Sequence, residues 1–325
     1  MSIPLTLIGG YLGSGKTTLV NRVLSSPTVG RTAVVVNDFG AVNVDAALIV
    51  ATGADTMALT NGCICCQITD DVQRTMSNLA ARTDIDHVLC EVSGIGDPSQ
   101  LGTWRTFPGF RPGPIVICAD ALVTPRRLAD EFVADVVRRQ IAAADLLLVT
   151  KADVATAEQV EATADACARI APNAAIHTVT QRGFDPLLDR LCRWDSEDRT
   201  NEQVEDVDAQ GTISTHSDLH RTVTVALSGE VHAQEVESVL ELHAGGLIRA
   251  KGFVRDVNGW WRQLQLAGGT VSSTPLPEGA NAPSQPEIVL IAVGTSAEQA
   301  LTAAGNGLRA LTERDVSHPT HIAYH

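Results

Sequence analysis

A glycine-rich segment near the start of the chain has the residue types and spacing that bind a polyphosphate. The sequence Gly10-x-x-x-x-Gly15-Lys16-Thr17 follows a short apolar run over residues 3–8 and precedes apolar side chains at helical spacing. Strand, glycine-rich turn and helix in this order are typical of a P-loop, whose backbone N–H groups point at phosphate oxygens. Lys16 is expected to reach the β- and γ-phosphates, and the Thr17 hydroxyl is expected to bind Mg²⁺. The predicted nucleotide contacts of this segment are Gly10, Gly13, Ser14, Gly15, Lys16, Thr17 and Thr18.

A second motif places an acid at the end of a strand and a glycine three residues later. It reads His87-Val-Leu-Cys-Glu91-Val-Ser-Gly94, which is typical of a Walker-B strand that leads into a nucleotide-sensing loop. Glu91 is expected beside the Mg²⁺ shell or as the group that positions the attacking water, and the Gly94 N–H is expected to meet the γ-phosphate. The catalytic set predicted from these two motifs is Lys16, Thr17 and Glu91.

The segment Thr150-Lys151-Ala152-Asp153 follows an apolar run and indicates which base is bound. A carboxylate at Asp153 can accept hydrogen bonds from guanine N1–H and its N2 amine, which adenine does not offer. Lys151 can lie along the base. The alternative is that Lys151 and Asp153 only cap the helix that follows.

A first nucleotide-sensing loop is predicted after the second strand, in the sequence Asp38-Phe39-Gly40-Ala41-Val42-Asn43-Val44-Asp45. Asp38 and Asp45 are candidate contacts to Mg²⁺ or to its waters. Each of the two carboxylates could instead cap a turn.

Three of the seven cysteines lie within four residues, as Cys63-Ile64-Cys65-Cys66. Thiolates at this spacing can converge on one ion and select Zn²⁺, Cu⁺ or Co²⁺ over hard cations. The alternative is a group of small buried hydrophobic residues. His216 and His220 could add ligands, although solvated histidines are the commoner case. The other cysteines are expected in the core: Cys90, Cys118, Cys167 and Cys192.

The elements that must position these residues alternate between strands and helices along the first 193 residues. Apolar runs near residues 3–8, 31–37, 56–60, 87–91, 114–120, 145–150 and 175–180 are predicted as strands, and residues 126–144, 154–170 and 184–191 as helices. This alternation predicts an α/β domain, a P-loop NTPase domain with a mostly parallel sheet covered on both faces.

A smaller α+β domain is predicted over residues 219–325, after an acidic and polar linker at 194–218. Asn258-Gly259 is a strong hairpin signal between two strands. Further strands over 220–227 and 287–293 and helices over 231–243 and 296–311 predict an antiparallel sheet with two helices on one face. Trp260 and Trp261 are expected in the core and rim of that sheet.

Composition narrows the class of protein. The formal charge of −14 disfavours a general nucleic-acid or anionic-membrane surface. We find no signal-peptide pattern and no apolar stretch long enough for a membrane helix. The odd number of cysteines and their clustering are typical of a reducing compartment, so a cytoplasmic protein is expected.

The ordered motifs together resemble those of the CobW-like family of GTPases, relatives of HypB and UreG. The resemblance covers nearly the whole chain and includes Arg249-Ala-Lys-Gly252 in the second domain. It implies a GTP-hydrolysing metallochaperone whose C-x-C-C cysteines hold the transferred metal. The family often has glutamate where this sequence has Asp38, and a second acid where it has Ala41. The histidine-rich tract that is common before the second domain is also missing here.

We therefore expect GTP and Mg²⁺, with Zn²⁺ or Co²⁺ as the transferred ion and a client metalloprotein as partner, and we leave a homodimer open. The C-x-C-C segment lies between the two nucleotide-sensing loops, so GTP and metal should favour one conformation together. The alternative is a regulatory GTP and metal sensor that transfers no metal. A P-loop small-molecule kinase with a structural zinc is a third class, disfavoured by the Thr150–Asp153 motif.

Overall fold

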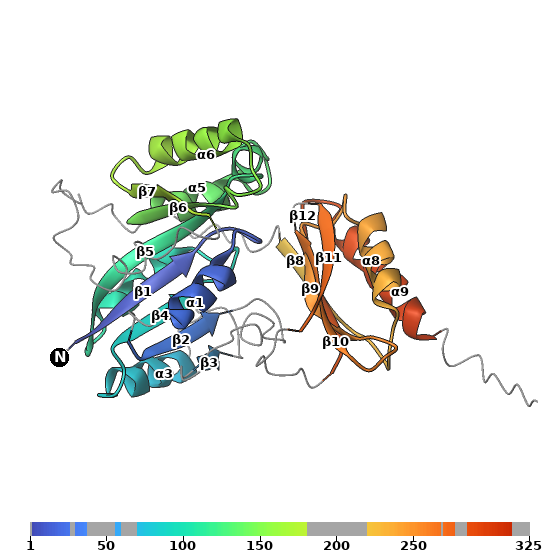
Figure 1. Ribbon diagram of the computed structural model, residues 1–325, viewed down its shortest axis with the longest axis horizontal. Helices are drawn as coiled ribbons and strands as arrows, with labels where there is room; N and C mark the ends of the chain where they lie inside the picture. The colour runs from blue at the N-terminus through green and yellow to red at the C-terminus, as the bar shows by residue number, and fades with distance from the viewer. Residues whose placement is uncertain are drawn as a thin grey trace, which may run out of the picture. The chain divides into compact units, whose positions relative to one another are not determined.

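The computed structural model describes residues 2–26, 30–37, 56–59, 70–180, 220–267, 269–276 and 285–313 of the 325-residue chain. They divide into two compact units (Figure 1), the first comprising the described residues up to 180 and the second those from 220 onward. Each unit has its own sheet and its own apolar core.

A seven-stranded sheet forms the first unit, in the strand order β3-β2-β4-β1-β5-β6-β7. Its strands are β1 (Ile3–Gly9), β2 (Thr32–Asn37), β3 (Thr56–Leu59), β4 (His87–Glu91), β5 (Phe110–Asp120), β6 (Leu146–Thr150) and β7 (Ala175–Thr178). Every pair of neighbouring strands in this sheet is parallel. Its helices are α1 (Lys16–Ser25), α3 (Asp70–Ala80), η1 (Pro98–Thr106), α4 (Thr124–Leu128), α5 (Ala134–Ala142) and α6 (Ala157–Ile170). The predicted α/β class with a mostly parallel sheet is confirmed.

The parallel arrangement decides where the functional motifs meet. β1 lies between β4 and β5 in the sheet, so β2 to β4 lie on one side of β1 and β5 to β7 on the other. Because all these strands run in one direction, their carboxyl ends share one edge of the sheet, and ligands of such sheets bind at that edge. Glu91, Asp120 and Thr150 are the last residues of β4, β5 and β6 respectively, and the P-loop follows β1.

The prediction of a single helix over residues 126–144 is wrong. The structure has two helices there, α4 and α5, with a break between residues 128 and 134. Asp130 Oδ1 accepts the Phe132 N–H at 2.9 Å, and the Asp130 carbonyl accepts the Ala134 N–H at 2.9 Å. A side chain that bonds the backbone in this way competes with helical hydrogen bonding. The first helix therefore ends at Leu128, and a second helix, α5, begins at Ala134.

The next helix begins three residues later than the predicted start at Val154. Thr156 Oγ1 accepts the Gln159 N–H, and the Gln159 side chain accepts the Thr156 N–H at 2.9 Å. This reciprocal capping box fixes the first turn of α6. The cap is thus Thr156, which leaves Lys151 and Asp153 in a turn that precedes the helix.

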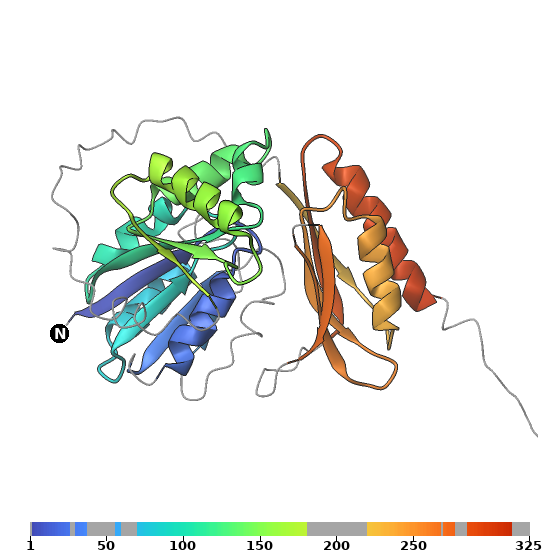
Figure 2. The ribbon, with the colours of Figure 1, turned by 45° about the horizontal axis from the view of Figure 1, so that its top comes forward.

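The second unit is an antiparallel sheet with two helices on one face (Figure 2), as predicted. Its strand order is β11-β10-β9-β12-β8. The strands are β8 (His220–Ala226), β9 (Arg249–Arg255), β10 (Trp261–Ala267), β11 (Thr270–Pro275) and β12 (Glu287–Val293), and the helices are α8 (Ala233–Leu242) and α9 (Ala297–Glu313). Both helices contribute to one apolar cluster with alternate residues of the strands, including Leu240, Leu308, Val254, Leu264 and Leu290.

The structure of this unit differs from expectation at one strand, one tryptophan and one histidine. The sequence does not predict β11, because this strand is polar and lies at the sheet edge, where none of its residues is fully buried. Trp260 is 73% exposed beside the Asn258-Gly259 turn, so it is not a core residue, whereas Trp261 is half-buried as the first residue of β10. His220 is buried as the first residue of β8, so it is not solvated, and His216 lies outside the described residues.

Three cysteines occupy the core of the first unit, as predicted. Burial raises the pKa of the Cys90 and Cys118 thiols to about 12 and that of Cys167 to about 11, so all three are neutral. Cys192 lies outside the described residues. In the described part of the chain, none of the helices combines the length and the apolar character needed to cross a bilayer.

Candidate functional site

The loop between β1 and α1 has the backbone geometry of an anion cradle. Gly10, Gly13 and Gly15 have φ values of 130°, 78° and 96°, in the region that residues with a side chain rarely adopt. Gly15 is the N-cap of α1, and the first turn of that helix contains no acidic residue. The positive end of the helix dipole is therefore free of competing carboxylates from its own first turn.

The lysine of this loop is buried and folded back over it. Lys16 is 6% exposed, and its Nζ donates to the Gly10 carbonyl at 3.0 Å. The bond closes the loop on itself and holds the ammonium against the loop backbone, within the glycine-rich segment that would surround an anion.

A hydroxyl and a carboxylate meet beside this lysine. Thr17 Oγ1 donates to Glu91 Oε1 at 3.1 Å. Glu91 is 2% exposed and lies opposite Ile8 in the pairing of β1 with β4. Two hard oxygen atoms from different elements are the kind of donor set that Mg²⁺ accepts, so the residues present fit that ion.

The loop that follows Glu91 packs directly on the P-loop. A Cβ added at Gly94 would lie 2.4 Å from Leu12 Cδ2 and 3.1 Å from Leu12 Cα, so a larger residue would require Leu12 to shift. Within the loop, the Gly96 N–H donates to the Ser93 carbonyl at 2.9 Å. Movement of this loop is thereby coupled sterically to the P-loop.

A buried glutamine, which the sequence did not reveal, holds the same loop. Gln140 on α5 is 2% exposed, and its Nε2 donates to the carbonyls of Gly94 at 3.2 Å and Gly96 at 2.7 Å. A lone glutamine in an amphipathic helix carries no pattern that indicates such a contact. Only the packing of α5 beside this loop creates it.

The predicted base-reading residues lie at the end of β6. Thr150 Oγ1 donates to the Ser14 carbonyl at 2.8 Å, which joins this strand end to the P-loop. Lys151 has a φ of 59°, and its Nζ lies 2.6 Å from Asp120 Oδ2. Asp153 is exposed in the turn that follows.

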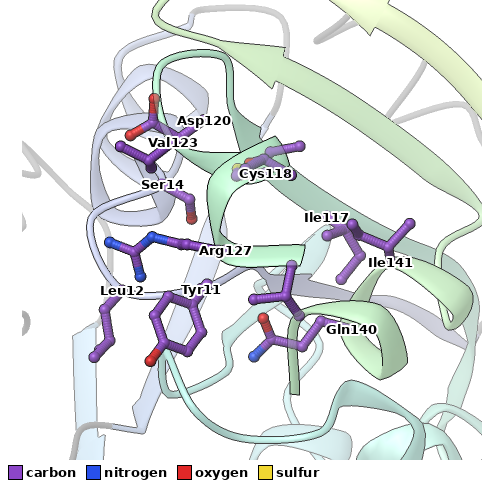
Figure 3. A pocket seen from close by; sticks show the side chains of 13 residues that line it. Tyr11, Leu12, Ser14, Ile117, Cys118, Asp120, Val123, Arg127, Gln140 and Ile141 are labelled. Atoms are coloured by element: carbon purple, nitrogen blue, oxygen red, sulfur yellow. The ribbon is translucent and has the colours of Figure 1, made fainter. Parts of the chain in front are cut away.

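A small pocket lies on the α4–α5 side of the P-loop (Figure 3). The Arg127 guanidinium lies over the Tyr11 ring, 4.4 Å from its centroid. Burial raises the pKa of the Tyr11 hydroxyl above its usual range, with the positive charge of Arg127 opposing the shift. Ser14 and Gln140 also line this pocket, whose walls come from the P-loop, β5, α4 and α5.

Several predicted site residues lie outside the described residues: Asp38, Asp45, Cys63, Cys65 and Cys66. Within the described ranges, no group of three or more His, Cys, Asp or Glu side chains could hold a metal ion. The predicted phosphate and base residues that the structure does describe, from Gly10 to Asp153, lie together at one edge of the sheet.

Two family models match this chain. Residues 4–178 match "CobW/HypB/UreG, nucleotide-binding domain", and residues 220–305 match "Cobalamin synthesis protein cobW C-terminal domain". The two matches fall on the two units of the structure.

Curated relatives carry related names. The chain is 31% identical over 193 residues to the "Zinc chaperone CobW" of Sinorhizobium sp, covering 50% of this chain and 54% of the relative. It is 33% identical over 195 residues to the Escherichia coli "Zinc chaperone YjiA", covering 56% and 59%. A Dictyostelium discoideum "Zinc-regulated GTPase metalloprotein activator 1" is 36% identical over 118 residues, covering 32% and 25%. The chain thus spans about half the length of the first curated relatives it matches.

Among solved structures, the "Zn(II)-bound YjiA GTPase from E. coli" aligns with a TM-score of 0.46 and 24% identity, over 95% of this chain and 99% of that one.

Proposed function

This chain belongs to the CobW/HypB/UreG family of nucleotide-binding proteins, and from that premise we propose that it is a GTP-hydrolysing metallochaperone. It would bind a transition metal, Zn²⁺ or Co²⁺, and deliver it to a client metalloprotein in the cytoplasm. The observation that carries the nucleotide half of this proposal is the Thr17–Glu91 hydrogen bond of 3.1 Å beside the P-loop lysine.

The phosphates are assigned to the P-loop and to the loop after β4. Backbone N–H groups from Gly10 to Thr18 would surround the β- and γ-phosphates, and Lys16 would exchange its bond to the Gly10 carbonyl for phosphate oxygens. Gly94 would offer its N–H to the γ-phosphate. Because Gly94 packs on Leu12, both loops would sense the same phosphate.

Mg²⁺ would be held by the Thr17 hydroxyl, with Glu91 binding it directly or through a water molecule. When bound, the ion would neutralise the negative charge that develops in phosphoryl transfer. Glu91 has a second role open to it, because a buried carboxylate in this place can orient the attacking water. Asp38 is an additional candidate for the Mg²⁺ shell.

The base is assigned to Thr150, Lys151 and Asp153. The exposed Asp153 carboxylate is available to accept the two donors of guanine, while Lys151 is anchored beside it. Thr150 connects this strand end to the P-loop carbonyl of Ser14, so base and phosphate sites are parts of one rigid edge.

The metal half of the proposal is supported by the Cys63-Ile64-Cys65-Cys66 motif and by relatives named as zinc chaperones. Three thiolates would bind the transferred ion, and hydrolysis of GTP would loosen the neighbouring loops and release it. Linkage requires that GTP and metal change each other's affinity by the same factor. A homodimer is an additional proposal.

The test is a competitive chelator titration with Zn²⁺ and with Co²⁺, in the presence of Mg²⁺-GTP, Mg²⁺-GDP or no nucleotide. GTP should tighten metal binding about 5–150-fold, a typical coupling. Cys65→Ala should remove the high-affinity site and its effect on hydrolysis, while GTP binding stays near that of the parent chain. Cys167→Ala is the matched control, because that thiol is buried in the core and neutral.

Equal metal affinity in all three nucleotide states would leave the cysteines as a structural site and would contradict the mechanism. Transfer to a metal-free client separates the chaperone from the alternative, a regulatory GTP and metal sensor. A coupled metal site that never passes its ion to any client would favour the sensor.

A further inference from the structure

A buried carboxylate that belongs to none of the sequence motifs lies beside the lysine of the Thr150–Asp153 segment. Asp120 ends β5 and is 4% exposed. Its Oδ1 accepts the Leu122 N–H at 2.9 Å, and its Oδ2 lies 2.6 Å from Lys151 Nζ. Each carboxylate oxygen therefore has a fixed partner, and the lysine ammonium is anchored to a strand end. Figure 3 shows the Asp120 side chain beside the pocket.

The register of the sheet fixes this anchor relative to the phosphate site. Asp120 lies opposite Thr150 in the parallel pairing of β5 with β6. The Thr150 hydroxyl is also held in place, because its Oγ1 donates to the Ser14 carbonyl at 2.8 Å and lies 3.3 Å from the Ala119 carbonyl. The ion pair and the P-loop are thus attached to the same two strand ends.

The backbone of Lys151 also depends on its surroundings. With a φ of 59°, it is the only non-glycine residue with positive φ in the described part of the chain. Such a conformation persists where neighbouring contacts hold it, and it recurs at ligand sites. The Lys151 side chain is 36% exposed, so its charged end is bound to Asp120 while part of its stem faces solvent.

We propose that Asp120 is a positioning residue for guanine-nucleotide binding. It holds the Lys151 ammonium, so that the aliphatic stem of the lysine lies along the base that Asp153 reads. This inference rests on the proposed GTP site and adds a residue to it. The pair acts at the base and not at the γ-phosphate, so losing it should weaken GTP and GDP binding equally.

The test measures GTP, GDP and ATP affinities by competition with a fluorescent guanine nucleotide, using the full chain. Asp120→Asn keeps an acceptor for the Leu122 N–H and removes the charge, and Lys151→Met keeps the stem and removes the ammonium. Each should weaken GTP and GDP binding about 10-fold, as for one charged hydrogen bond, with the GTP-to-GDP ratio unchanged. The double variant should bind within about twofold of Lys151→Met alone, because both changes remove one interaction.

Asp145→Asn is the matched control. The Asp145 side chain is as buried as that of Asp120. Its Oδ2 accepts the Ile115 N–H at 2.8 Å and pairs with Arg105 Nη2 at 3.0 Å. It immediately precedes the first residue of β6, whereas Thr150 is the last residue of that strand. This variant should lose thermal stability and keep the nucleotide affinities of the parent chain.

Three results would overturn the inference alone: parent-like GTP and GDP affinity in Asp120→Asn, an equal loss in Asp145→Asn, or fully additive losses in the double variant. A parent chain that binds no guanine nucleotide would overturn the inference together with the proposed function. Lys151→Met keeps the test decisive if Asp120→Asn does not fold, because the lysine variant must then show the loss by itself.

Discussion

The Thr17 hydroxyl lies 3.1 Å from Oε1 of Glu91, although 74 positions separate them in the chain. Thr17 belongs to the first turn of α1, and Glu91 is the last residue of β4. They meet because β1 and β4 are parallel neighbours with Ile8 opposite Glu91. This pair, beside Lys16, is the feature of the described structure that most directly supports phosphoryl transfer.

Substitution of the P-loop side chains should reduce nucleotide binding and hydrolysis while the protein stays folded. Lys16→Ala is expected to abolish GTP hydrolysis, and Thr17→Ala to weaken Mg²⁺-dependent nucleotide binding, because positioning and charge neutralisation carry this reaction. Phosphate release and nucleotide titration at several Mg²⁺ concentrations measure the two effects. Ser25→Ala, at an exposed position of α1, is the control and should behave as the parent chain. An unaltered rate in Lys16→Ala would refute the assigned site.

The choice of base should depend on Asp153. We expect the parent chain to prefer GTP over ATP by at least ~10-fold, since a lost charged hydrogen bond is worth ~1.5–3 kcal/mol. Asp153→Asn should reduce that preference, which competition binding with both nucleotides measures. Glu158→Gln provides an exposed acid nearby, in the first turn of α6, and should leave the ratio unchanged. Equal binding of ATP and GTP by the parent chain would contradict the prediction.

Gln140 should control the loop after β4. Gln140→Met removes the donors to the Gly94 and Gly96 carbonyls while keeping the volume of the side chain. We expect a loss of stability of about 1–3 kcal/mol from the buried carbonyls. Hydrogen exchange of residues 92–97 should become faster, and kcat for GTP should fall more than the affinity for Mg²⁺-GDP. Arg138→Met, at an exposed position of α5, is the control, and unchanged exchange in Gln140→Met would refute the role.

His87 should make the stability of the first unit depend on pH. Burial, followed by the charge of Arg111, lowers the pKa of this histidine from 6.5 to about 4, and its Nε2 lies 2.9 Å from Thr6 Oγ1. Because the unfolded chain binds the proton more tightly, this contribution is fully present above pH 6.5 and is lost as the pH falls towards 4. The loss across that window is about 3 kcal/mol.

Urea unfolding of the parent chain and of His87→Gln at pH 7.5 and pH 4.5 measures this effect. The variant should show a smaller fall in unfolding free energy over that range. If both proteins lose the same free energy, the histidine is not the titrating group.

Local patterns in the sequence determined much of this protein. The spacing of Gly10, Gly15 and Lys16 lies within one turn, and the acid at Glu91 ends a continuous apolar run, so both were predictable. Alternating apolar runs and helical patterns likewise predicted the parallel sheet and the second, antiparallel one. Each of these signals depends on residues close together in the chain, where backbone geometry and burial act directly.

The tertiary structure alone decided which distant residues meet. Gln140 reaches the Gly94 loop, and Asp120 reaches Lys151, only because particular strands and helices are neighbours in a particular register. No periodicity marks either residue, since a polar side chain in an apolar segment has many partners open to it. The break at Asp130 was missed for the same reason, because a single side-chain hydrogen bond outweighed an unbroken helical pattern. Register, and not residue type, selects the partner of a buried polar group, and register is a property of the folded sheet.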